Sequence, residues 1–276
     1  MSFRRTHAIA LLCVVAVVMP VAGAAQAPRR VAPRAGYTFR DEQRVDRFVV
    51  QRWASPDSPS DSPSGECECI TLVFDGQREL LNLGEFSGTQ RVSALADVTG
   101  DRQAELVVVT HSGGAHCCES TAIYSIDGTT ATPLLSVMTD DCLGELVDLD
   151  GDGRAEFQTC DAGFGYEFCS FASSPMPPVV FTYEPSQRRF VLATRRYARR
   201  LPPPREADVK AAFDTAGKDP ELLRCAALGP ALHAIYTGTI DDGLKRFRQL
   251  YRGNDGPVVE AKLLQLVRAS SLWMPQ

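Results

Sequence analysis

The chain has 276 residues, of which 44% are hydrophobic, and its formal net charge is −5 at pH 7. This length and hydrophobic content suffice for a medium-sized domain with a buried core and a smaller second domain. A mildly acidic chain lacks the basic surface that nucleic-acid binding requires, so we expect no nucleic-acid partner.

Residues 1–24 have the pattern of a secretory signal peptide. Arg4 and Arg5 make its start positive, residues 8–19 are apolar, and residues 22–24 form an Ala-x-Ala cleavage motif. The apolar stretch is too short to span a bilayer. We therefore expect a periplasmic or secreted protein without an integral membrane segment after signal cleavage. Losing the two arginines moves its formal charge from −5 to −7.

Eight cysteines follow this segment, and an even number in an exported chain favours disulfide bonds. Seven of them lie between residues 67 and 169, which is an odd number. If all eight are paired, Cys225 must therefore cross-link the C-terminal region to the part of the chain before it. The other pairings stay open. The eight are Cys67, Cys69, Cys117, Cys118, Cys142, Cys160, Cys169 and Cys225.

The next part of the chain predicts a β domain over residues 37–194. Residues 25–40 are rich in Pro, Arg and Ala and predict a loose arm, which we place at residues 25–36. The Ser/Pro/Asp-rich residues 55–65 predict a flexible loop. Alternation of apolar and polar residues over 67–74, followed by Asp75-Gly76, predicts a strand and a hairpin turn. Further strands are predicted over residues 47–53, 107–110, 122–126, 179–183 and 189–192.

An acidic loop at residues 148–156 carries carboxylates at its first, third, fifth and ninth positions, with glycines at the fourth and sixth. Ca²⁺ prefers roughly six to eight oxygen ligands, which a tightly curled acidic loop can supply. The alternative is an Asp/Gly-rich turn that needs no ion. Unlike an EF-hand, the loop has Thr159 at position twelve and leads into a strand. We predict a calcium site made by the side chains of Asp148, Asp150, Asp152 and Glu156 and the carbonyl oxygen of Arg154.

The same pattern recurs 51 residues upstream, in residues 97–105, with Thr at the third position and Arg at the sixth. This spacing suits an internal repeat of one small β unit. The ligands predicted for a second calcium ion are the side chains of Asp97, Thr99, Asp101 and Glu105 and the carbonyl oxygen of Gln103.

Residues 95–101 and 146–153 resemble FG-GAP/VCBS-type repeats, which carry an Asp-x-Asp-Gly-Asp-Gly-x-x-Asp/Glu calcium loop between strands. The resemblance covers roughly residues 92–194 and implies a mainly β fold of antiparallel repeats, either an incomplete propeller or a sandwich-like arrangement. The chain has room for two or three such units, whereas a closed propeller of this type needs about seven. Residues 113–118 and the C-terminal helices are also similar to exported bacterial proteins of unknown function.

Residues 195–205 combine five arginines with three consecutive prolines and predict a basic, Pro-rich connector. We expect a solvated linker whose arginines pair with nearby acids, and the alternative is contact with an anionic envelope surface. From residue 206 the pattern is helical. Helices are predicted over residues 206–215, 241–251 and 258–272, and one from an Asp219 N-cap to near Gly238 with a kink at Pro230. Together they would form a helical cap over residues 206–276.

A second constellation consists of His116, Cys117 and Cys118, which Cys67 and Cys69 could join. Thiolates and imidazole can bind Cu(I) or Zn²⁺ or exchange disulfides, whereas oxidation would make the same cysteines structural. No known catalytic motif surrounds the histidines, and we assign no catalytic residue. We expect a calcium-binding, disulfide-stabilised binding or structural module of the cell envelope, with a protein or glycan partner. The alternative is a periplasmic enzyme or a thiol- or metal-handling protein.

Overall fold

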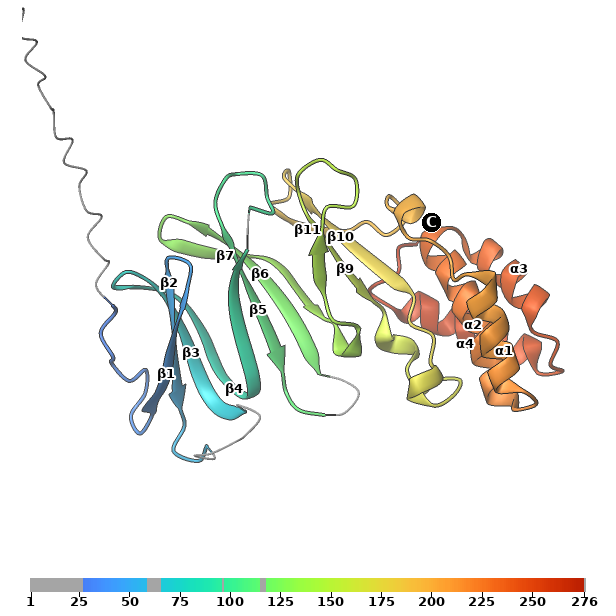
Figure 1. The fold of residues 1–276 in the computed structure, drawn as a ribbon, viewed down its shortest axis with the longest axis horizontal. Coiled ribbons are helices and arrows are strands. Elements are labelled where there is room, and N and C mark those ends of the chain that lie inside the picture. The colour runs from blue at the N-terminus through green and yellow to red at the C-terminus, as the bar shows by residue number, and fades with distance from the viewer. Residues whose placement is uncertain (1–26, 59–65, 96, 115–117, 276) are drawn as a thin grey trace, which may run out of the picture.

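The computed structural model describes residues 27–58, 66–95, 97–114 and 118–275. The predicted signal peptide, most of the Ser/Pro/Asp-rich loop, His116 and Cys117 lie outside these residues. Strands occupy the first two thirds of the described chain and helices the last third (Figure 1). The predicted mainly β fold with a C-terminal helical region is therefore confirmed.

The strands form two antiparallel sheets in which every strand neighbours the next one in sequence. The seven-stranded sheet contains β1 (Thr38–Val45), β2 (Phe48–Ala54), β3 (Cys67–Asp75), β4 (Arg78–Leu95), β5 (Glu105–His111), β6 (Glu119–Asp127) and β7 (Thr130–Met138). The four-stranded sheet contains β8 (Glu145–Val147), β9 (Glu156–Cys160), β10 (Pro178–Glu184) and β11 (Arg189–Leu192).

Strand β4 changes partner at Gly88. Residues 78–88 pair with β3, and residues 89–95 pair with β5. Gly88 has a φ of +132°, and a Cβ there would lie 2.1 Å from the carbonyl oxygen of His111, so only glycine fits this close approach. The seven-stranded sheet thus consists of two four-stranded meanders that share β4, and the four-stranded sheet is a third meander.

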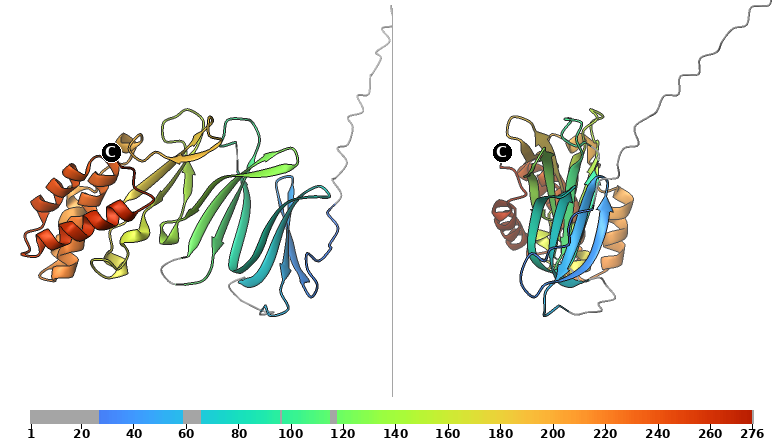
Figure 2. Two further views of the ribbon diagram at one scale, coloured as in Figure 1. Left: turned by 180° about the vertical axis from the view of Figure 1, so that it is seen from behind. Right: turned by 90° about the vertical axis from the view of Figure 1, so that its left-hand side faces the viewer.

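Apolar side chains hold the meanders together. A buried cluster between the two sheets joins β5, β6 and β7 to β9 and β11, and it includes Val107, Ile123, Leu135, Phe157 and Phe190. The helices are α1 (Glu206–Ala216), α2 (Pro220–Thr237), α3 (Ile240–Leu250) and α4 (Gly256–Ala269), and they cover one end of the molecule (Figures 1 and 2). Among the described residues, none of the helices combines the length and apolar character needed to cross a membrane.

The start of α2 follows the sequence signal. The side chain of Asp219 accepts hydrogen bonds from the backbone N–H groups of Glu221 (2.9 Å) and Leu222 (3.1 Å), and Pro220 occupies the first helical position. The helix then joins the β region covalently through a disulfide bond between Cys169 and Cys225. This bond confirms that Cys225 cross-links the helices to the preceding part of the chain.

The connector is less solvated than we expected. Tyr197 and Leu201 are only 3% and 4% exposed, and they pack in a small cluster with Val180 and Ala193. The charge pattern of the connector does not predict this buried tyrosine, because the neighbouring arginines make the whole segment look solvent-exposed.

Candidate metal site

The two acidic loops occupy equivalent places in successive meanders. Residues 97–105 connect the paired strands β4 and β5, and residues 148–156 connect β8 and β9. The ninth loop residue begins the second strand in both cases, since Glu105 pairs with Leu95 and Glu156 pairs with Val147. The predicted repetition of the loop between two strands is therefore present in the fold.

The first aspartate of the upstream loop organises its turn. The Asp97 carboxylate accepts hydrogen bonds from the backbone N–H groups of Gly100 (2.6 Å), Asp101 (2.9 Å) and Arg102 (2.6 Å). Gly100 and Arg102 have φ angles of +82° and +68°. Arg102 holds this left-handed conformation although it has a side chain, which is uncommon outside glycine.

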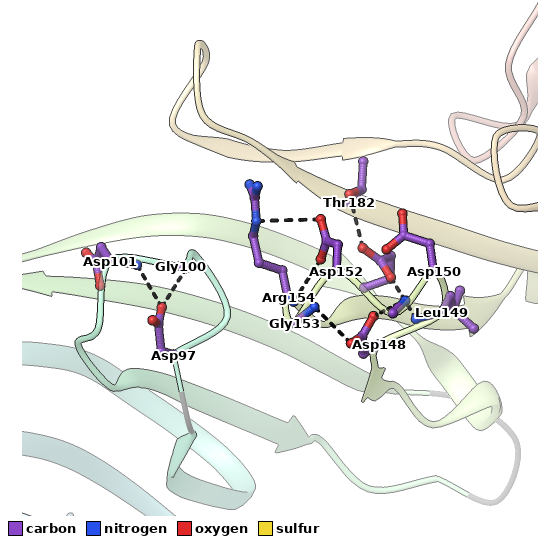
Figure 3. Close-up of polar contacts among 12 residues, drawn as sticks. Asp97, Gly100, Asp101, Asp148, Leu149, Asp150, Asp152, Gly153, Arg154 and Thr182 are labelled. Atoms are coloured by element: carbon purple, nitrogen blue, oxygen red, sulfur yellow. Dashed lines mark hydrogen bonds and ion pairs between the residues drawn. The ribbon is translucent and has the colours of Figure 1, made fainter.

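The downstream loop has the same turn (Figure 3). The Asp148 carboxylate accepts hydrogen bonds from the backbone N–H groups of Gly151 (2.7 Å) and Gly153 (3.0 Å). The φ angles of these glycines are +82° and +86°, close to those at the matching upstream positions. Because a glycine has no steric penalty there, the downstream loop adopts this turn with less strain.

The closing glutamate folds back over its loop in both copies. Glu105 accepts a hydrogen bond from the backbone N–H of Val98 (2.7 Å), and Glu156 accepts one from Leu149 (2.9 Å). The exposed fraction is 0% for Glu105 and 2% for Glu156. A buried carboxylate needs compensation by hydrogen bonds or a cation.

Three carboxylates converge in each loop. Carboxylate oxygens of Asp97, Asp101 and Glu105 lie within 4.8 Å of one another, and those of Asp148, Asp150 and Glu156 do the same. Burial raises the pKa of Glu105, and the charges of Asp101 and Asp97 add to this shift, while hydrogen bonds from Val98 and Thr99 oppose it. A donor set made entirely of oxygen atoms suits a hard cation such as Ca²⁺.

Asp152 and Thr99, two predicted ligands, lie beside these clusters. Asp152 accepts a hydrogen bond from the backbone N–H of Arg154 (2.8 Å), and its other oxygen lies 3.7 Å from the Arg154 guanidinium (Figure 3). Asp152 is not among the carboxylates that converge in its loop, whereas the equivalent Asp101, which accepts the same kind of hydrogen bond from the backbone N–H of Gln103, does belong to the upstream cluster. The hydroxyl of Thr99 donates to Glu105 (3.0 Å). The carbonyl oxygens of Gln103 and Arg154 stay predicted ligands.

Donors from outside the loop contact the downstream cluster, and no local sequence pattern indicates them. The hydroxyl of Tyr197 donates to Glu156 (3.0 Å) and lies 3.3 Å from a carboxylate oxygen of Asp150. The hydroxyl of Thr182 on β10 lies 3.3 Å from Glu156, and the Arg196 guanidinium lies 3.6 Å from Asp150. Burial raises the pKa of Tyr197 to about 12, so its hydroxyl stays protonated and able to donate.

The two loops are neighbours in space (Figure 3). A Cβ placed on Gly100 would lie 3.3 Å from the Arg154 side chain, so the arginine of one loop covers the turn of the other. Val98, next to Asp97, is 3% exposed within the apolar cluster between the two sheets. Order in the upstream loop is thereby linked to packing between the meanders.

The cysteine cluster differs from a thiolate metal site wherever the structure describes it. Cys67 is bonded to Cys69, Cys142 to Cys160, and Cys118 is also disulfide-bonded. His111 accepts a hydrogen bond at Nδ1 from the backbone N–H of Gly113 (3.2 Å). These cysteines therefore provide no free thiolate ligands in the oxidised protein.

Comparison with known proteins gives one partial similarity. The chain is 30% identical over 140 residues to a protein of Sinorhizobium fredii (strain NBRC 101917 / NGR234) called "Uncharacterized protein y4bJ". The match covers 48% of this chain and 22% of that protein, so the chain spans about a fifth of its relative's length. No family model matches the chain. No solved structure matches it either.

Proposed function

We propose that this chain is an exported calcium-binding β-repeat protein of the FG-GAP/VCBS type. The observation that carries the proposal is the repeated loop. In both copies an aspartate orders the turn, and three carboxylates, including a buried glutamate, converge within 4.8 Å. Mutual repulsion and burial both disfavour the ionised cluster, and a divalent cation would remove both penalties.

The geometry favours a binding or structural module, with calcium as a stabilising ion. Each loop is a strand connection, and the upstream loop buries Val98 between the two sheets. Cations bound at both loops would hold the second and third meanders in one arrangement. The surface of these meanders would then be available to a protein or glycan partner of the cell envelope.

The calcium contribution to stability would be small. Extracellular calcium modules have dissociation constants of roughly 10⁻⁴–10⁻³ M, so about 1 mM Ca²⁺ would add ~0.4–1.4 kcal/mol per site. The Cys169–Cys225 bond closes a loop of 56 residues and contributes about 4 kcal/mol in the chain-entropy account. Disulfides would then maintain the fold, and calcium would order the loops.

Calorimetric titration of Ca²⁺ into oxidised, chelator-treated protein tests the proposal. We expect binding at two loops, with one site lost in Asp150→Ala and the other in Asp101→Ala. Asp127→Ala is the matched control, because Asp127 is an exposed aspartate at the end of β6, outside both acidic loops, and it should retain both sites. Absence of binding at millimolar Ca²⁺ in the unsubstituted protein would reduce both loops to acidic turns.

A further inference from the structure

A cavity of about 560 Å³ lies between the β8–β9 edge and the connector, away from the acidic loops. The Cys142–Cys160 disulfide forms part of its wall, together with Met176, Thr159 and His233. The Met176 sulfur lies 4.0 Å from the Cys142 sulfur. A disulfide at the wall of an open cavity is accessible to a reagent that enters it.

The backbone around Cys142 is strained. Asp140 and Leu143 lie on either side of this cysteine and have φ angles of +47° and +41°. Neither is glycine, and non-glycine residues in this conformation persist only where the surrounding structure holds them. Part of that restraint comes from the disulfide itself, because Cys142 is bonded to Cys160 at the end of strand β9. Opening the bond would allow the strained turn to relax.

The cavity also contains groups suited to handling a proton. Thr159 lines the cavity, and its buried hydroxyl has no hydrogen-bond partner among the residues that the structure describes. The His233 Nε2 atom lies 3.2 Å from the carbonyl oxygen of Leu201, and the Pro202 backbone also interacts with the ring. A carbonyl only accepts, so a neutral ring that donates to Leu201 has its proton on Nε2 and its lone pair on Nδ1. Burial lowers the pKa of His233, which keeps the ring neutral at neutral pH.

The Cys169–Cys225 bond provides the contrast. Its cysteines are only 6% and 5% exposed and belong to the apolar core that joins the helices to the β region. Cys142 and Cys160 are each only partly buried. Labile disulfides are typically strained or exposed, whereas structural ones resist reduction.

We propose that Cys142–Cys160 is a thiol-exchange site and that the cavity receives the thiol of a small molecule or of a partner protein's dithiol. The incoming thiol gives its proton to Nδ1 of His233, and the resulting thiolate forms a bond to the Cys142 sulfur. The Cys142–Cys160 bond breaks, its electron pair stays on the Cys160 sulfur, and His233 returns the proton there. A second thiol then attacks the mixed disulfide and releases Cys142 as a thiol, so that the dithiol is oxidised and the protein disulfide is reduced by two electrons.

Reduced glutathione is the first probe, applied to the oxidised protein, with alkylation and peptide mass spectrometry at successive times. We expect a glutathione adduct at Cys142 and opening of Cys142–Cys160 about tenfold faster than opening of Cys169–Cys225. A dithiol reagent should give the same order without a lasting adduct. Equal rates for the two bonds, or faster opening of Cys169–Cys225, would overturn the proposal.

Three variants separate the proposed roles from general destabilisation. His233→Gln keeps a donor for the Leu201 carbonyl but cannot take the thiol proton, and it should slow exchange about tenfold. Leu143→Gly relieves a positive φ at an exposed residue and should also slow exchange. Met176→Leu keeps the apolar contact and should leave the rate unchanged. If His233→Gln and Met176→Leu exchange equally fast, the proton-transfer role of His233 is wrong.

Discussion

The two acidic loops share one backbone conformation but differ in how the closing glutamate is satisfied. In the upstream loop, Thr99 at the third position donates a hydrogen bond to Glu105, so the loop supplies its own donor. In the downstream loop the third residue is Asp150, which adds a carboxylate and removes that donor. Glu156 instead receives hydrogen bonds from Thr182 and Tyr197, which lie in β10 and the connector.

One added carboxylate therefore changes which residues donate hydrogen bonds to the closing glutamate. A carboxylate at the third position adds negative charge that can attract a cation. It cannot donate a hydrogen bond to the closing glutamate, so that glutamate needs donors from elsewhere in the fold. The downstream loop is also enclosed by the Cys142–Cys160 bond, which closes a ring of 18 residues around it. We therefore expect Glu156 to respond to substitutions in β10 and the connector, whereas Glu105, whose side-chain donor Thr99 belongs to its own loop, should not respond to them.

Removal of the enclosing disulfide should produce the largest effect. A Cys142→Ser, Cys160→Ser double variant should lose about 3 kcal/mol of unfolding free energy, because the unfolded chain regains the entropy of an open loop. Calcium affinity should fall at the downstream loop and stay constant at the upstream loop. Urea unfolding and calorimetric titration measure the two effects. An equal loss of affinity at both loops would show that they are not independent.

Replacement of the first aspartate should have the next largest effect. Asp97 accepts three backbone hydrogen bonds and Asp148 accepts two, so each Ala variant leaves charged-acceptor hydrogen bonds unmade. We expect Asp97→Ala to lower the unfolding free energy by about 2 kcal/mol, and Asp148→Ala by somewhat less. Denaturant unfolding in the presence of a chelator excludes the contribution of calcium. If Asp148→Ala lowered the unfolding free energy more than Asp97→Ala, the donors from outside the loop, Thr182 and Tyr197, would contribute more to stability than the hydrogen bonds of the turn.

Neutralising Glu105 should stabilise the calcium-free protein. Burial raises its pKa, so the folded state binds a proton more tightly than the unfolded state. The contribution of Glu105 to stability is therefore fully present below its pKa in the unfolded state. It is lost as pH rises through its raised pKa in the folded state. Glu105→Gln should remove this loss, add on the order of 1 kcal/mol at neutral pH and abolish calcium binding upstream. Thermal unfolding against pH, with a chelator present, tests the sign.

Sequence patterns predicted the parts of the fold whose signals are local. The Cys67–Asp75 strand, the β10–β11 hairpin and the capped start of α2 all depend on neighbouring residues. Strands β1, β7 and β8 were missed, and β4 was indicated only by the hairpin turn that precedes it. β1 is mostly polar, β7 contains Pro133, and β8 has only three residues, so none shows a clear alternation of buried positions.

In the candidate site, too, only the features with a local sequence signal could be predicted. The carboxylate spacing indicated both loops, because the predicted ligands of each loop lie within nine residues of chain. The contact between Tyr197 and Glu156 joins residues 41 positions apart, and the contact between Gly100 and Arg154 joins different meanders. Such contacts depend on the pairing of whole strands, which a single sequence does not specify.

Removal of the Tyr197 hydroxyl should have the smallest effect on stability and the most selective effect on calcium. Tyr197→Phe keeps the buried ring but deletes the hydrogen bond to Glu156, which should cost about 0.5–1 kcal/mol. Calcium affinity at the downstream loop should fall about tenfold, because a partner that orients a ligand is lost. The upstream loop, whose donor is Thr99, should be unaffected. If both loops weaken together, calcium binding at one loop is transmitted to the other through their shared contact at Gly100 and Arg154.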